Sequence, residues 1–205
     1  MSLVSLSTFK EYLPEIQGTG SDTELQNLLE RVESACAGYL GFPRPTAGAA
    51  GSVASSLEDR SYTFHIDEPL NSLPYVLPIP IRPLISVTSF HSDVQRVYGS
   101  DTEIAASEFD VDTNLGRIII KDASSATIET GYRANKVVCT AGFTSAPQDL
   151  EHAVCVFGSM LQRSKQTQGK DSTSQRDVTI KISPRTMPQE VKDILYSYRA
   201  FGRIL

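Results

Sequence analysis

The chain has 205 residues, of which 40% are hydrophobic and 21% charged, a composition typical of a globular domain with or without an insertion. No apolar run approaches the ~20 residues of a membrane-spanning helix, and the first residues lack the basic region and long apolar stretch of a secretory signal. The formal net charge of −5 argues against a protein that coats nucleic acid with its whole surface.

Charge is distributed unevenly along the chain. Residues 1–160 contain 10 Lys and Arg against 20 Asp and Glu, whereas residues 161–205 contain 9 against 4. The body of the chain is therefore acidic and the C-terminal part basic. Two interpretations stay open, namely chance clustering on solvated faces and a basic tail that binds an acidic partner.

Two helices are expected in the first part of the chain, over residues 7–13 and 22–40. Apolar residues recur at helical spacing along the second of them. Ser21 and Glu24 have the spacing of a capping box, in which each side chain accepts from a free N–H at the helix start. Gly41 follows as a residue that can take the left-handed conformation of a helix end.

Helical spacing returns in the last third of the chain. One helix is expected to begin near Ser145, which has the capping-box spacing with Gln148, and the other spans residues 188–200 with Thr186 as its cap. Polar residues 164–178 separate the two helices and are expected to form a mobile linker. Residues 43–57, rich in Gly, Ala, Pro and Ser, form another expected loop.

The middle of the chain has the pattern of short β-strands. Prolines alternate with apolar residues over 73–83, which predicts extended chain at a sheet edge or outside the sheet. Short gaps between strands favour antiparallel pairing. Strands are expected over residues 60–66, 84–91, 108–112, 117–121, 126–130 and 136–141.

The sequence therefore predicts an α+β fold. A small helical domain of about four helices is expected to comprise residues 1–42 and 144–205. An antiparallel β-rich insertion, residues 58–141, is expected between the second and third helices.

No motif in the sequence points to catalysis, a cofactor or a metal. His65, His91 and His152 lie far apart, and none has a second ligand at metal-binding spacing. The three cysteines have apolar neighbours and no C-x-x-C spacing, so we expect buried thiols. Residues 110–116 resemble a calcium loop, but Leu115 stands where that loop needs Gly, and a strand end with an Asx turn explains them better.

Five segments occur in an order that resembles a known family. They are Leu3-Val4-Ser5-Leu6 to Leu13, Asp22-Thr23-Glu24-Leu25 to Gly41, Leu77-Pro78 to Ser89 with Phe109 to Ile118, Val137 to Phe143 with Pro147-Gln148-Asp149-Leu150, and Met187-Pro188 to Arg199. In this succession the chain resembles the head-to-tail connector proteins, or adaptors, of tailed bacteriophages. Residues 43–57 and 164–178 and the tail beyond Arg199 depart from that pattern.

The resemblance implies a structural virion protein and not an enzyme. Such adaptors form a homo-oligomeric ring, usually a dodecamer, between the portal of a DNA-filled head and the next neck or tail protein. Genomic DNA passes through the ring without sequence-specific binding, and no membrane is involved. The expected location is the virion neck, and the host cytoplasm before assembly.

The last segment, residues 187–205, is the expected docking element. This segment has an apolar helical face, belongs to the basic C-terminal part of the chain and follows a polar linker. It can therefore dock on the portal or on a neighbouring subunit. The alternative, not exclusive of the first, is that this helix packs on its own domain. The expected partner-binding residues are Val191, Ile194, Leu195, Tyr198, Arg199 and Phe201.

Other functions stay open at this point. A stopper or tail-completion protein is a different neck component, but the four helical segments disfavour it because stoppers tend to be dominated by a β-barrel. A small hydrolase or ligand-binding module would use the β segment. That alternative requires two of the histidines to converge with a carboxylate.

Overall fold

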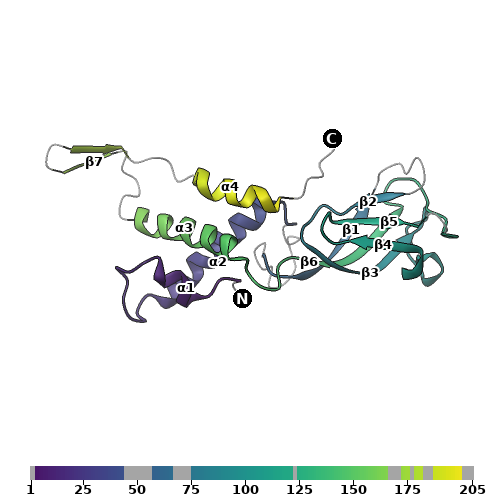
Figure 1. Cartoon of the computed structure of the whole chain (residues 1–205), viewed down its shortest axis with the longest axis horizontal. Helices are drawn as coiled ribbons and strands as arrows, with labels where there is room; N and C mark the ends of the chain where they lie inside the picture. Colours follow the sequence, from purple (N-terminus) through teal and green to yellow (C-terminus); the bar gives the residue numbers. More distant parts are fainter. Residues whose placement is uncertain are drawn as a thin grey trace. The chain divides into compact units, whose positions relative to one another are not determined.

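The computed structural model describes residues 3–43, 57–66, 75–121, 124–165, 172–175, 178–181 and 187–199 (Figure 1). They divide into two compact units. The helical unit contains the residues up to 57 together with 145–197, and the β unit contains 58–144 with Tyr198 and Arg199. Among the described residues, four α-helices and antiparallel sheets, with strands between the second and third helices, confirm the α+β class.

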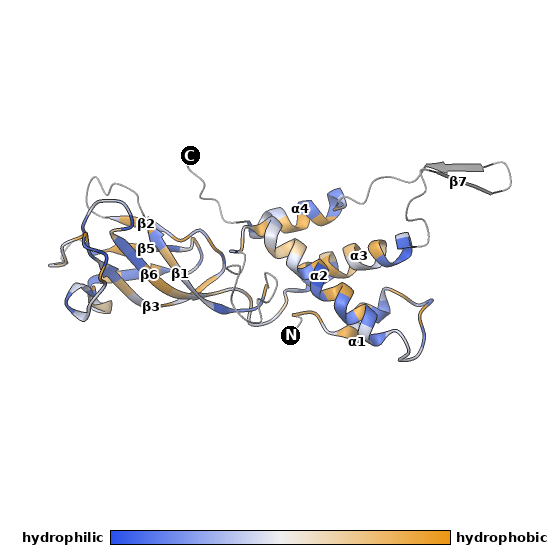
Figure 2. Cartoon of the chain, turned by 180° about the vertical axis from the view of Figure 1, so that it is seen from behind, coloured by the Kyte–Doolittle hydropathy of each residue, from blue (hydrophilic) through white to orange (hydrophobic). Residues whose placement is uncertain are grey.

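The helical unit is built on α2 (Asp22–Leu40) and α3 (Gln148–Ser164), which pack against each other, with α1 (Leu6–Glu11) against both. The fourth helix is α4 (Gln189–Tyr198). Figure 2 shows hydrophobic and hydrophilic residues alternating along these helices, as amphipathic packing requires. The largest fully buried side chains of this unit are Phe9, Leu13, Leu25, Leu29, Leu57 and Leu150.

The helix ends confirm some sequence predictions and correct others. The bounds of α2 are as predicted, and Gly41 ends it at φ 90°. Ser21 makes no side-chain capping bond, because its backbone (φ −107°, ψ 7°) is not in the extended conformation that aims the hydroxyl at the helix. Helix α3 begins only after Pro147, so the predicted box from Ser145 is also wrong. Thr186 lies outside the described residues.

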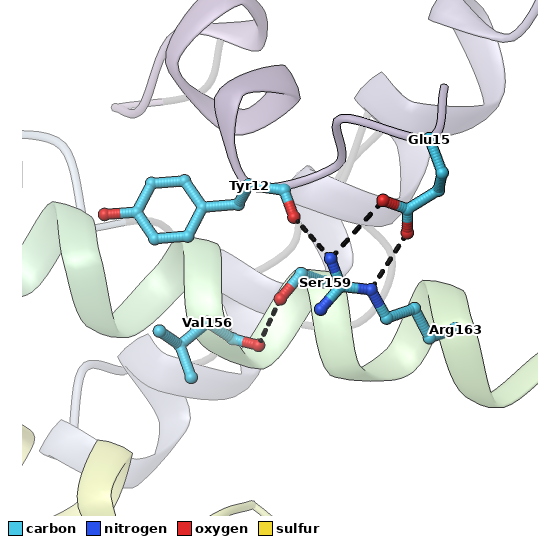
Figure 3. Close-up of polar contacts among 5 residues, drawn as sticks. All are labelled: Tyr12, Glu15, Val156, Ser159 and Arg163. Atoms are coloured by element: carbon cyan, nitrogen blue, oxygen red, sulfur yellow. Dashed lines mark hydrogen bonds and ion pairs between the residues drawn. The ribbon is translucent and has the colours of Figure 1, made fainter. Parts of the chain in front are cut away.

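Two contacts fix α1 on α3. The Arg163 guanidinium donates from Nε to the Glu15 carboxylate at 2.9 Å and from Nη2 to the Tyr12 carbonyl oxygen at 2.9 Å (Figure 3). One turn earlier, α3 comes so close to the buried Phe9 ring that a Cβ on Gly158 would lie 2.7 Å from it. A small residue and a long cation of α3 therefore set the position of α1.

The β unit contains two three-stranded antiparallel sheets. In the first sheet, β6 (Asn135–Ala141) lies between β1 (Arg60–Ile66) and β3 (Leu84–Ser92). In the second, β5 (Arg117–Ile120) lies between β2 (Val76–Pro78) and β4 (Phe109–Asp112). The proline-rich segment thus forms an edge strand, as predicted, because proline cannot donate to an inner ladder. Fully buried side chains of this unit are Leu77, Phe90, Ile118, Ile120, Val137 and Cys139.

Two expectations for irregular segments need correction. The predicted strand at 126–130 does not form. Side chains fix that backbone instead of a ladder: the Glu129 N–H donates to Ser92 Oγ at 2.7 Å, and Asn135 Nδ2 donates to the Glu129 carbonyl at 2.9 Å. Four residues of the expected linker form β7 (Ser172–Gln175), which pairs antiparallel with β8 (Val178–Lys181) just after it.

The residues that resembled a calcium loop form the β4–β5 turn. Asp112 Oδ1 accepts from the Leu115 N–H at 2.9 Å, which is the predicted Asx-type turn. Gly116 follows at φ 61° and returns the chain into β5. The aspartate therefore serves the hairpin.

Candidate assembly surfaces

The predicted docking residues do not share one open face. Val191 and Leu195 are fully buried within the chain, Ile194 and Tyr198 are half-buried, and Arg199 is exposed. Tyr198 packs edge-on against Phe143, with ring centroids 5.6 Å apart. Phe201 lies outside the described residues. The apolar stripe found in the sequence thus includes two residues that anchor α4 in its own chain.

The start of α4 is connected to α3 and α1 through one histidine. His152 on α3 has Nδ1 2.9 Å from the Tyr12 hydroxyl and Nε2 3.9 Å from the Glu190 carboxylate on α4. Burial is the main cause that raises the pKa of Tyr12, so its hydroxyl stays protonated at neutral pH. His152 therefore contacts residues of both other elements, Tyr12 after α1 and Glu190 on α4.

A loop with exposed apolar side chains and a hydrogen-bonded aspartate follows β3. The buried Asp93 carboxylate accepts the N–H groups of Gln95 and Val97 at 2.7 Å and of Tyr98 at 2.9 Å. These bonds stabilise the charged form and lower the pKa of Asp93. The loop turns Val94 and Val97 outward, with 52% and 76% of their surface exposed.

A second loop, just before β6, lies beside the first. The Tyr98 hydroxyl donates to the Arg133 carbonyl at 2.5 Å, and the preceding Tyr132 is 70% exposed. Arg96, Tyr98 and Arg133 have φ values of 62°, 53° and 55°, and they are the non-glycine residues with positive φ in the described part of the chain. Left-handed backbone at such residues is strained and concentrates at functional positions.

Basic side chains surround Tyr98. Lys136 pairs with His65 on one side and His91 on the other, so the three stand in one row across the first sheet. The Lys136 ammonium lies 5.0 Å from the Tyr98 ring centroid, a cation–π contact. Arg133 Nη2 lies 3.2 Å from His65 Nδ1. Two of the three histidines thus converge, on a tyrosine and two cations.

An acidic hollow of about 410 Å³ opens beside the same loops. The buried Ile104 and Ser92 are among the residues that line it. Because His91 and Ser92 are successive residues of β3, their side chains point to opposite faces of the sheet. The acidic hollow and the basic row therefore belong to different faces. The carboxylates of the hollow come from Asp101, Glu103, Glu108 and Glu129.

The three cysteine thiols are buried in the chain. Burial raises the pKa of Cys36 and Cys155 to about 12 and of Cys139 to about 11, so all three thiols stay protonated. Within the described ranges, no three His, Cys, Asp or Glu side chains group as metal ligands would. The described helices also include none that is long and apolar enough to span a membrane.

The comparisons with known proteins give one kind of match. No protein-family model matches the chain, and no curated protein matches it. Among solved structures, it is similar to a chain in the virion of a native gene transfer agent (GTA) particle, with 18% identity and a TM-score of 0.59, covering 99% of this chain and 92% of that one. A chain in the neck of an empty GTA particle computed with C6 symmetry gives the same values.

A third similar chain comes from the neck of a native GTA particle computed with C12 symmetry. It has 17% identity and a TM-score of 0.55, and the match covers 100% of this chain and 95% of the other. The similarity therefore extends over both the helical and the β residues. At this level of identity it establishes that the chain has the fold of these chains in GTA particles.

Proposed function

We propose that the chain is a structural neck protein, an adaptor that forms a ring between the portal and the next neck or tail component. The observation that carries the proposal is the fold match to neck chains over nearly the whole of both proteins. A neck computed with C12 symmetry supports a ring of twelve copies. The order of sequence segments described above supports the same assignment independently of the coordinates.

A DNA channel is consistent with the acidic body of the chain. Carboxylates on a channel wall repel phosphate groups, whereas a Lys and Arg groove would bind them strongly and with marked salt dependence. The excess of 20 acidic over 10 basic residues in positions 1–160 suits a wall that DNA passes without being held.

The C-terminal segment is the proposed contact with the portal or a neighbouring subunit. Val191 and Leu195 hold α4 in the chain, so the partner would meet the outer edge of the helix and the residues beyond it. That contact comprises Ile194, Tyr198, Arg199 and Phe201. The net positive charge of residues 161–205 favours an acidic receiving surface.

Native mass spectrometry of the protein, alone and mixed with the portal encoded near it, tests the assignment. A ring formed alone or only on the portal is expected. A protein that stays monomeric and does not bind the portal would overturn it. Binding to a tail-side component without portal binding would instead assign a stopper or tail-completion role.

Point variants separate docking from folding at the C-terminus. The double variant Arg199→Glu, Phe201→Ser is expected to lose attachment to heads while its melting temperature stays near that of the wild type. Leu195→Ala is the matched control, because it leaves a cavity in the core and lowers the free energy of unfolding by about 2–5 kcal/mol without altering the outer edge. Normal attachment of the double variant would contradict the docking role.

A further inference from the structure

Two hollows of the β unit adjoin and form one groove. The acidic hollow and a second hollow of about 400 Å³ share four of their lining residues, namely Ser92, Asp101, Thr102 and Glu129. The second hollow also includes the exposed Val94 and Val97 of the loop after β3. We call the two hollows together the acidic groove. It combines carboxylates with apolar side chains, and all of its lining residues belong to the β unit.

Part of the groove is lined by a segment with the sequence pattern of a strand. Residues 125–127 and Glu129 line the acidic hollow. The N–H and carbonyl groups of Glu129 both bond to side chains of the first sheet, Ser92 on β3 and Asn135 on β6. Because Ser92 and Asn135 are opposite residues in that ladder, both backbone groups of Glu129 face the same sheet. In extended chain the N–H and carbonyl of one residue point to the same side in this way, so side chains hold this segment as a ladder holds a strand.

The backbone groups next to Glu129 lack a ladder partner. The N–H groups of Thr127 and Ile128 and the carbonyl groups of residues 125–128 make no hydrogen bond to any other described residue. An unpaired edge of extended chain binds a further strand through its main chain. The groove therefore presents main-chain donors and acceptors, as well as side chains, to a polypeptide that lies in it.

The carboxylates of the groove determine which kind of polypeptide fits. None of Asp101, Glu103, Glu108 and Glu129 takes part in an ion pair between described residues. Asp101 and Glu103 are exposed, so a cation reaches them without displacing a basic side chain of the described chain. Alternate side chains of a strand point to the same face. A strand with Lys or Arg at every second position therefore directs several cations toward the groove.

We propose that the acidic groove binds an extended basic segment of another protein, which adds as a strand along residues 125–128. Lysine or arginine side chains of that segment contact the carboxylates, and an apolar side chain contacts Val94 or Val97. Complementary charge and main-chain pairing select this occupant together, since neither a compact basic surface nor an acidic peptide can use both. The inference goes beyond the proposed function, because the groove lies within a single β unit and does not require a ring.

Binding of short labelled peptides to the full chain tests the strand addition. A peptide in which Lys alternates with Thr and Val should bind, as measured by fluorescence polarisation. The same peptide with Glu in place of Lys should bind at least about tenfold more weakly, because like charges then meet. A Lys peptide with N-methylated amides along its pairing edge should also bind at least about tenfold more weakly, because it lacks main-chain donors. A Lys peptide that does not bind, or N-methylation without effect, would overturn the proposal.

Two double variants with the same change in charge locate the binding site. Asp101→Lys with Glu103→Lys should weaken binding of the Lys peptide at least about tenfold. Glu11→Lys with Glu30→Lys, at exposed positions of the helical unit, is the matched control and should bind the peptide as the wild type does. An equal loss in both double variants would show attraction to net charge alone and would overturn the proposal.

Hydrogen exchange gives a readout that charge alone does not move. The bound Lys peptide should slow amide exchange at Thr127 and Ile128, whose N–H groups have no partner among the described residues, and leave exchange in α2 unchanged. Protection that appears elsewhere and not in residues 125–130 would contradict strand addition. Ring formation on the portal is measured separately, so a Lys peptide that does not bind refutes this inference alone, whereas a chain that forms no ring on the portal refutes the proposed function alone.

Discussion

Asp93 shows how a single side chain determines a surface. Its carboxylate accepts hydrogen bonds from three backbone N–H groups of the loop that follows β3. In the loop held in this way, Val94 and Val97 point toward solvent. An aspartate before a turn is common, so its position in the sequence does not reveal this role. The partner loop lies more than thirty residues further on, at Tyr132 and Arg133.

The Asp93 loop should be sensitive to acid. Backbone hydrogen bonds hold the pKa of the Asp93 carboxyl below its ordinary value of 3.8 in the folded chain. The stability that the charged carboxylate gives to the fold is therefore present above pH 3.8 and is lost as the pH falls through the folded pKa. Asp93→Asn should therefore be less stable than the wild type at pH 7, with the difference narrowing below about pH 4. Denaturant unfolding of both proteins across this range measures it, and a constant difference would contradict the prediction.

Three glycines make a graded series. Gly142→Ala places a Cβ 2.5 Å from the Glu58 carbonyl oxygen at φ 118°, and Gly158→Ala presses on Phe9. Overpacking at Gly158 should lower the free energy of unfolding by about 1–3 kcal/mol, and Gly142→Ala should lower it further because a backbone atom cannot yield. Gly38→Ala, on an open face of α2, should raise it by up to ~1 kcal/mol. Thermal unfolding ranks the three variants. Equal free energies of unfolding would contradict the close contacts at Gly142 and Gly158.

At the scale of the element, the sequence predicts what depends on local periodicity. The bounds of α2 and of β1 are as expected. Helix α2 buries one face along its length, and the first five residues of β1 alternate between half-buried and exposed. The strand expected at 126–130 failed because its partners are the side chains of Ser92 and Asn135, which no local pattern indicates. The capping boxes failed because a matching pair of residues does not fix the backbone angles of the cap.

Arg163 should be the residue that keeps α1 on α3. Replacing Arg163 with Ala removes both donors to Tyr12 and Glu15, so amide exchange in residues 6–13 should become faster. Arg163→Lys should rescue only in part, since an ammonium cannot reproduce the fork of a guanidinium. Hydrogen exchange with mass spectrometry reads the effect, and Arg31→Ala on the exposed face of α2 is the control that should leave these amides unchanged.

At the scale of the whole molecule, the order of helices and strands could be predicted and the surfaces could not. The surface around Tyr98 requires two distant loops to meet, and the acidic hollow requires segments from before β4 and after β5. The expected docking helix illustrates the limit, because its periodicity does not tell whether Leu195 is covered by its own chain or by a partner. The structure shows that the chain covers it.

Assembly should weaken as salt is added. Salt screens the attraction between an acidic and a basic surface. The Debye length, over which this attraction acts, falls from about 8 Å at 0.15 M to about 3 Å at 1 M salt. Attachment of the basic C-terminal segment to an acidic receiving surface should therefore weaken at high ionic strength. Analytical ultracentrifugation across this range measures the response, and assembly strengthened by salt would indicate an interface dominated by apolar burial.

The burial of the three thiols makes them reporters of motion. Cys36 and Cys155 lie in the helical unit and Cys139 lies in the β unit, and each is fully covered. A thiol reagent can modify such a residue only when its surroundings open, so the rate of labelling at each position measures the opening of one unit. The natural sequence thus allows the two units to be followed separately, in the free protein and in an assembled particle, without introducing a label.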